Sequence, residues 1–343
     1  MNGLILFLGT LVVLVLGKPV FIPLIIAAFL WYLTNAISAY YRKLLPCKES
    51  GLTLCKTFDV TAFLLSIATL IIFVFAFSTQ IRPMFTELSS RLPEIQSSMI
   101  TLVNYLSDAL GIRINPSSLP DFTVIAANIG MSLGNAVLSF GMVLVYMLFM
   151  FIEQSTFKKK ISHLFPDNRK LKKINFILNS IAANMKKYMF MKTAISLATS
   201  ILAYLWLKYL GIEFAGVWAF VVFITNYIPT FGAIVSTALP LFYSLITADT
   251  LQTPLLVAGG LVIIQILLGN IIEPKLTGKT LNISTLAILI NLIFWGMIWG
   301  AIGMFFSVPL LMTIFIITAQ FDKTRWVAIL LSANGEIPAK EED

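Results

Sequence analysis

The sequence predicts an all-α membrane protein, a polytopic helix bundle with Pro/Gly-broken or re-entrant helices in its C-terminal third and a small helical extracytoplasmic domain. Of its 343 residues, 58% are hydrophobic and only 12% are charged, and its mean hydropathy is +0.91. Soluble domains carry about 45–50% apolar and about 25% charged residues. A soluble fold of this length could not bury so much apolar surface. The composition therefore excludes a secreted enzyme, a nucleic-acid-binding domain and a disordered scaffold.

The chain opens with apolar stretches that we expect to form N-terminal membrane helices over residues 1–80. A spanning helix needs about 20 mostly apolar residues, and spans are predicted near Leu4–Gly17, Val20–Tyr41 and Phe58–Gln80. The first two are expected to form an uncleaved hairpin. A removable signal peptide is not expected, because the N-terminus has neither a basic start nor a small-residue cleavage site.

Residues 81–128 form a polar, charge-balanced segment that we expect to be the extracytoplasmic helical domain. Its apolar residues recur with alternating spacings of three and four, at Phe85, Leu88, Leu92, Ile95, Met99, Leu102 and Leu106. That spacing is typical of a helix with a coiled-coil-like seam, and Pro93 fits the first turn of a second helix. The seam suits contact between subunits and packing within one subunit equally well.

One membrane helix is expected over residues 129–152, followed by a basic segment over residues 153–190. This segment repeats the helical apolar spacing from Leu171 to Tyr188, with lysines on the other faces. The pattern favours an amphipathic helix at the membrane surface over a subunit contact. Because basic loops stay in the cytoplasm, the sequence predicts cytoplasmic N- and C-termini.

Residues 191–321 form an apolar C-terminal region, and residues 322–343 are expected to be a cytoplasmic tail. Pro, Gly and Asn interrupt the apolar region from Asn226 to Val235 and from Gly269 to Lys279. Pro removes a backbone donor and Gly permits chain reversal, and the freed backbone groups need partners in protein or in a water-filled cavity. Each pair of short segments either crosses the membrane or forms a re-entrant hairpin. Paired interruptions of this kind indicate the substrate site of a transporter.

Six residues in these interruptions are candidate contacts for a solute or ion: Asn226, Pro229, Gly232, Asn270, Glu273 and Lys275. The two Asn side chains offer donors and an acceptor, although Asn226 could instead satisfy orphaned carbonyls at a helix end. The Glu273 carboxylate could bind a cation, carry a proton, or pair with Lys275 or Lys279. A local ion pair or helix cap would explain Glu273 equally well.

Other polar and small residues of the C-terminal third have simpler interpretations. Lys192 is expected to extend its ammonium group to the membrane interface. Gly296, Gly300 and Gly303 are expected to let helices approach one another closely.

No catalytic motif is present in the sequence. It contains no paired-His metal motif, no Ser nucleophile between glycines and no phosphate-binding loop. We therefore expect no enzyme activity, no cofactor and no metal, and transport that is passive or ion-coupled. The net charge of +8 reflects cytoplasmic loops rather than a nucleic-acid partner. Cys47 and Cys55 are expected to be reduced thiols.

Several of these motifs resemble the signatures of the autoinducer-2 exporter (AI-2E) family. The first signature is matched by Asn226-Tyr227-Ile228-Pro229, Gly232 and Pro240. The second is matched by Gly269-Asn270, Glu273-Pro274-Lys275, Gly278, Ser284, Phe294-Trp295-Gly296, Gly300, Gly303-Met304 and Pro309. The order of the segments along the chain is also similar. Departures occur at Asn282, where a Gly is common in the family, and at the bulky Thr230-Phe231 pair.

The resemblance implies a polytopic protein of the bacterial cytoplasmic (inner) membrane that forms homo-oligomers. One branch of the family is assigned to autoinducer-2 export, and another to sodium(lithium)/proton antiport. We therefore expect an integral membrane transporter in the lipid bilayer that moves a small polar solute, autoinducer-2 or similar, by motion of its C-terminal third against the early spans. Two alternatives stay open: a cation/proton antiporter that takes a monovalent cation, with Glu273 as its titrating acid, and a non-transporting membrane scaffold or assembly factor.

Overall fold

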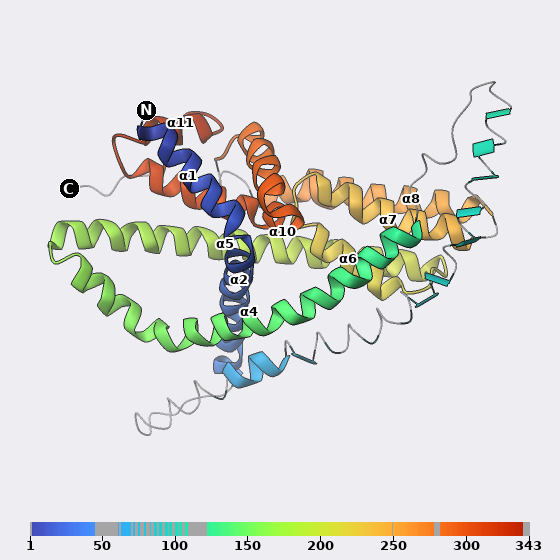
Figure 1. Ribbon diagram of the computed structural model, residues 1–343, viewed down its shortest axis with the longest axis horizontal. Coiled ribbons are helices and arrows are strands. Elements are labelled where there is room, and N and C mark those ends of the chain that lie inside the picture. The colour runs from blue at the N-terminus through green and yellow to red at the C-terminus, as the bar shows by residue number, and fades with distance from the viewer. Residues whose placement is uncertain are drawn as a thin grey trace. The chain divides into compact units, whose positions relative to one another are not determined.

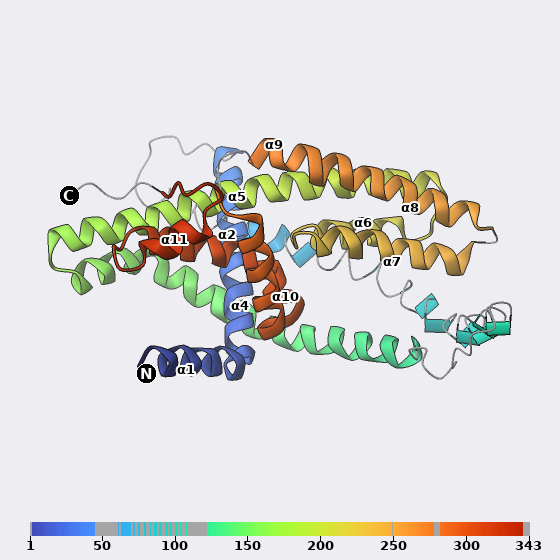
Figure 2. The ribbon, with the colours of Figure 1, turned by 90° about the horizontal axis from the view of Figure 1, so that it is seen from above.

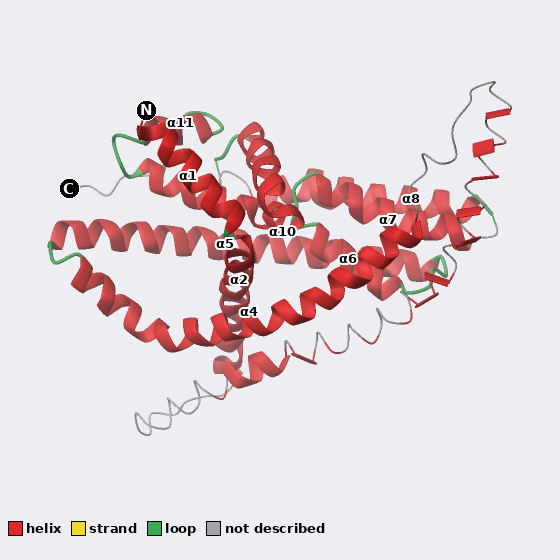
Figure 3. Cartoon of the chain, viewed as in Figure 1, coloured by secondary structure: helices red, strands yellow, loops and turns green. Residues whose placement is uncertain are grey.

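The computed structural model describes residues 2–44, 122–248, 250–277 and 282–338, together with scattered helical positions between residues 61 and 108. Every regular element in these residues is a helix, and the only pairing of extended backbone among them is one isolated antiparallel bridge (Figure 1, Figure 3). The predicted all-α fold class is confirmed. The chain forms two compact units, Pro23–Glu153 and Met1–Ile22 with Gln154–Asp343.

The unit Pro23–Glu153 is built on α2 (Lys18–Leu44) and α4 (Phe122–Leu164). Ala27 of α2 is buried against Val143 and Met147 of α4, and the Phe63 ring stacks on the Phe151 ring with centroids 3.7 Å apart. α4 is continuous for 43 residues, through the predicted boundaries at residues 128/129 and 152/153.

Parts of the N-terminal prediction lie outside the described residues. All seven residues of the external seam, from Phe85 to Leu106, are among them, as are Cys47 and Cys55. The described positions between residues 83 and 108, Pro93 included, are helical. Helical structure in the predicted extracytoplasmic domain is therefore observed only at these positions.

In the other unit, α5 (Asn168–Tyr209) is the helix on which α6, α8, η2, α9 and α10 pack. Asp167 caps its N-terminus, because the Oδ1 atom accepts a hydrogen bond from the Arg169 N–H at 3.0 Å. The helix has 42 residues and is therefore about 63 Å long. From Asn168 onward, the predicted basic segment and the membrane span after it therefore form one continuous helix, whereas residues 153–164 belong to α4.

The first predicted interruption is the tip of a helical hairpin. α6 (Ala215–Thr225) leads to the tip at residues 226–230, and α7 (Phe231–Thr247) returns alongside α6. With 11 residues, α6 is about 16 Å long, which is about half of the hydrocarbon thickness of a bilayer. This length favours the re-entrant alternative for the hairpin.

The second predicted interruption differs from expectation. α8 (Gln252–Gln265) continues through the π-helix η2 (Ile266–Ile272) into α9 (Glu273–Thr277), and the three form one helical run beside α5 and α7 (Figure 2). The helix widens at Gly269 without breaking, and the described helical run continues to Thr277, inside the predicted interruption from Gly269 to Lys279. The Glu273 N–H bonds the Leu268 carbonyl, five residues back, and this wider turn accommodates Pro274 at the next position.

α10 (Thr285–Ala319) reverses direction at Gly300, whose φ is +66° and ψ is −146°. The Asn291 amide donates to the Ser307 carbonyl at 2.7 Å, although the two would be about 24 Å apart in a straight helix. A Cβ on Gly303 would lie 2.0 Å from the Trp295 carbonyl oxygen. The predicted close-packing role of Gly303 is confirmed, and α10 is a second helical hairpin. Its Trp299 indole donates to the Leu14 carbonyl of α1 (Asn2–Leu16).

The C-terminal segment returns to the start of α10. α11 (Arg325–Leu331) packs on α10, and Ile283 pairs with Ser332 in the antiparallel bridge. Asn282 has φ +41° and donates from its amide to Asn334 and to the Glu336 carbonyl. Asn tolerates a positive φ better than other non-glycine residues, so it can occupy a backbone conformation that favours Gly.

Among the described residues, four helices are long and apolar enough to cross a membrane: Lys18–Asn35, Asn168–Tyr209, Gln252–Leu276 and Thr285–Ala319. The protein is therefore a multi-pass membrane protein.

Candidate functional site

A cavity of about 660 Å³ lies between α5, the tip of the α6–α7 hairpin, α7 and the α8–α9 run. Its polar and charged lining residues are Lys192, Asn226, Thr230, Thr237, Gln265, Asn270 and Glu273. Apolar side chains of α7 and α8 complete the wall. Residues from both interrupted segments therefore line the same cavity.

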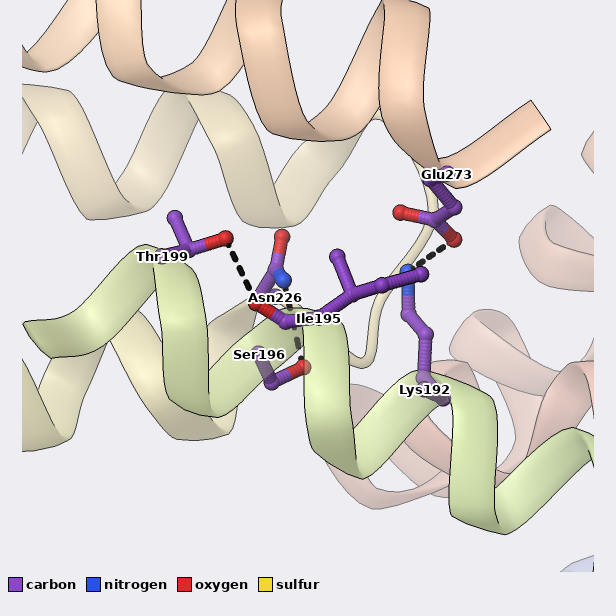
Figure 4. A network of polar contacts seen from close by, with 6 residues as sticks. All are labelled: Lys192, Ile195, Ser196, Thr199, Asn226 and Glu273. Atoms are coloured by element: carbon purple, nitrogen blue, oxygen red, sulfur yellow. Dashed lines mark hydrogen bonds and ion pairs between the residues drawn. The ribbon is translucent and has the colours of Figure 1, made fainter. Parts of the chain in front are cut away.

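An ion pair lies in the wall of this cavity. The Lys192 Nζ atom of α5 is 2.5 Å from the Glu273 Oε1 atom of α9, and the two side chains point toward each other (Figure 4). The Lys192 side chain is 6% exposed and that of Glu273 is 25% exposed. The predicted interfacial position of Lys192 is wrong: a carboxylate 81 residues away in sequence compensates its buried charge.

The hairpin tip is fastened to α5 next to this pair. The Asn226 amide donates to the Ser196 hydroxyl at 3.1 Å, and the Thr193 and Tyr227 hydroxyls share a hydrogen bond of 2.7 Å. Asn226 is buried, so its amide both lines the cavity and joins two elements. Figure 4 shows Ser196 and Lys192 on the same helix, with Asn226 approaching from the tip.

Thr230 adopts a rare backbone conformation at the tip. Its φ is 63° and ψ is −58°, and the Phe231 N–H donates to the Pro229 carbonyl at 2.6 Å. An i to i+2 hydrogen bond around these angles defines a γ-turn of the strained type. Strain of this kind persists only where surrounding contacts impose it, and it concentrates at functional sites.

Two contacts connect the remaining walls. The Gln265 amide of α8 donates to the Ser236 hydroxyl of α7 at 2.7 Å. The Tyr227 ring stacks on the Phe305 ring of α10, with centroids 4.8 Å apart. The cavity is therefore bounded by elements that are joined to one another by specific polar and aromatic contacts.

Four of the six predicted site residues line the cavity: Asn226, Pro229, Asn270 and Glu273. Gly232 does not, and its role is close packing, since a Cβ there would lie 1.9 Å from the Thr225 carbonyl oxygen. Lys275 is exposed and does not line the cavity. Lys279, its fellow candidate partner for Glu273, lies outside the described residues.

Sequence reasoning missed Lys192, Thr230 and Gln265 as lining residues. Gln265 carried a usable signal, because it is a lone amide within the apolar run from Leu255 to Leu268. For Lys192 the signal was ambiguous. A lysine at the start of an apolar helix can reach either an interface or a buried acid.

The sequence is similar to those of known membrane transport proteins. The family described as AI-2E family transporter matches residues 4–323. The AI-2 transport protein TqsA of Escherichia coli is 28% identical, over 97% of this chain and 96% of its own length. The putative transport protein YhhT of Escherichia coli is 33% identical over 39% of this chain and 38% of its own. A putative transport protein of Haemophilus influenzae is 32% identical over 56% of this chain and 55% of its own.

Proposed function

This chain belongs to the AI-2E family of membrane transporters, and from that premise we propose that it exports a small polar solute, autoinducer-2 or a similar molecule, across the cytoplasmic membrane. The solute binds in the cavity between α5, α7 and the α8–α9 run. As the sequence resemblance implies, the transporter acts as a homo-oligomer.

The convergence of both predicted segments on one cavity carries this proposal. Its volume of about 660 Å³ falls within the range of small-molecule sites, which combine apolar walls with a few placed polar groups. Here Asn226, Gln265 and Asn270 supply amide donors and acceptors beside apolar side chains. A polar solute with hydroxyl or carbonyl groups matches these side chains.

The antiporter alternative has less support. It requires Glu273 to exchange cations or protons freely, yet the carboxylate is already paired with Lys192. A cation that took this carboxylate would leave a buried ammonium group without its partner. The scaffold alternative rests on the external seam, which lies outside the described residues.

Replacing Asn270 by Ala tests the proposal. Asn270 is exposed and lines the cavity, so the replacement removes a contact with the solute. We expect autoinducer-2 flux from loaded vesicles to fall about tenfold, which corresponds to the loss of one hydrogen bond to a bound molecule. Lys275→Ala is the matched control, because Lys275 is exposed on the same helical run but does not line the cavity. Equal fluxes in wild type and Asn270→Ala, or no flux in wild type, would contradict the proposal.

A further inference from the structure

We propose that the Lys192–Glu273 pair makes the cavity select solutes without net charge, so that the protein carries neutral or zwitterionic molecules and rejects small monovalent ions. This inference rests on the proposed transport function and adds the electrical character of the substrate.

Among the described residues, the charges that line the cavity balance. Of the described residues that line it, Lys192 and Glu273 are the charged ones, with opposite signs and 2.5 Å between Nζ and Oε1. The ionisable groups beside them are the phenols of Tyr188, which interacts with Glu273, and Tyr227, which lies at the hairpin tip. Phenols are uncharged at neutral pH. A solute entering the cavity therefore meets a site with no net charge.

A monovalent cation binds Glu273 only if Lys192 gives up that carboxylate. The Lys192 side chain is only 6% exposed, so hydration does not replace the interaction that its ammonium group loses. Burying an uncompensated charge is strongly unfavourable in a low-dielectric environment. An inorganic anion has the converse effect, because it draws the Lys192 ammonium group away from the Glu273 carboxylate.

A solute without net charge avoids this cost. A neutral molecule can bond Asn226, Gln265 and Asn270 while the ion pair stays closed. A zwitterion can enter between the two groups, with its anion on Lys192 and its cation on Glu273, and each charge keeps a partner. Because the loaded and empty cavities then carry the same charge, transport is independent of membrane potential.

Charge-neutralising variants test the inference. Purified protein in vesicles is assayed with tetramethylammonium, methanesulfonate and autoinducer-2 as labelled probes, with and without an imposed potential. In wild type we expect either ion to move at least about tenfold more slowly than the neutral probe. Lys192→Gln removes the positive charge of the pair and is expected to gain tetramethylammonium flux. Glu273→Gln leaves Lys192 uncompensated and gains methanesulfonate flux.

Two variants separate the pair's charge from its role in folding. Lys192→Arg keeps the cation and is expected to reject both ions as wild type does. The exchange Lys192→Glu with Glu273→Lys keeps both charges and is expected to restore ion rejection, even if a single replacement lowers folded yield. Rapid flux of either ion in wild type, or ion selectivity unchanged in both single variants, overturns the inference.

The outcomes distinguish this inference from the proposed function. If autoinducer-2 does not move but the single variants acquire opposite ion selectivities, the substrate is wrong and the charge rule stands. If autoinducer-2 moves and the variants acquire no ion flux, the transport function stands and the charge rule fails.

Discussion

Gly232 lies at the start of α7, where the chain passes the end of α6 at the hairpin tip. The Thr225 carbonyl oxygen occupies the space that a side chain on Gly232 would need. Thr230, two residues earlier, is held at a positive φ by the γ-turn around it. Both residues shape the tip that presents Asn226 and Pro229 to the cavity, without themselves supplying a charge.

Replacing Gly232 by Ala is expected to destabilise the protein, because a Cβ would lie 1.9 Å from a backbone oxygen that cannot move alone. The expected loss is about 1–3 kcal/mol, measured as a lower melting temperature in detergent. Gly216→Ala in α6 is the control, since no atom lies within 4 Å of its Cβ position. Equal melting temperatures for Gly232→Ala and wild type would refute the close packing.

At the scale of elements, the C-terminal third contains two hairpins that differ in their turns. The α6–α7 tip spreads its reversal over residues 226–230, whereas α10 reverses at the single residue Gly300. With φ +66° and ψ −146°, Gly300 occupies a region that is open to glycine and closed to residues with a Cβ. The Tyr227–Phe305 stack joins the two hairpins.

Cysteines at positions 291 and 307 test the reversal in α10. The double variant Asn291→Cys with Ser307→Cys is made in a chain that lacks Cys47 and Cys55. We expect its two thiols to react with a cross-linker a few ångströms long, because the Asn291 amide donates to the Ser307 carbonyl at 2.7 Å. Adding Gly300→Ala is expected to abolish the cross-link, measured by mass spectrometry of digested peptides.

The control pair has the same separation in sequence within a straight helix. Lys170→Cys with Lys186→Cys places two exposed positions of α5 about 24 Å apart, so no cross-link is expected. A cross-link at both pairs, or at neither, would contradict a hairpin that is specific to α10.

At the scale of the whole molecule, the direction of α5 shows which ends of the helices around the cavity lie together. Trp206 near its C-terminal end donates to the Leu256 carbonyl of α8, and Lys192 pairs with Glu273 farther along. α5 and the α8–α9 run are therefore antiparallel, and Lys170 and Leu251 lie toward opposite ends of this unit. The basic segment from residue 153 to 190 then predicts which end faces the cytoplasm.

Single cysteines, introduced into a chain that lacks Cys47 and Cys55, test this orientation by labelling in intact cells. We expect Leu251→Cys, which replaces an exposed side chain between α7 and α8, to react with an impermeant maleimide from outside. Lys170→Cys is expected to react only after the membrane is permeabilised. The reverse pattern of labelling would mean that the basic segment faces outward and that the proposed direction of export is wrong.

Local properties of the sequence determined the class of this protein. Hydropathy and composition identified a multi-pass helical membrane protein, because each span must satisfy its own backbone and present apolar side chains to lipid. Pro, Gly and Asn also identified the segments around Asn226 and Asn270, since their effects on the backbone act within a few residues. The matched motifs indicated the family because they, too, are short patterns of neighbouring residues.

Only the tertiary structure decided which charges meet and how each interruption is built. Lys192 and Glu273 are 81 residues apart, and no periodicity or spacing relates them; helix packing alone brings the ammonium group to the carboxylate. Likewise, Pro229 lies in a tight turn and Pro274 directly follows a widened helical turn, although both are prolines in apolar surroundings. Whether neighbouring elements supply hydrogen bonds to the freed backbone depends on contacts between distant parts of the chain, and a local pattern does not contain them.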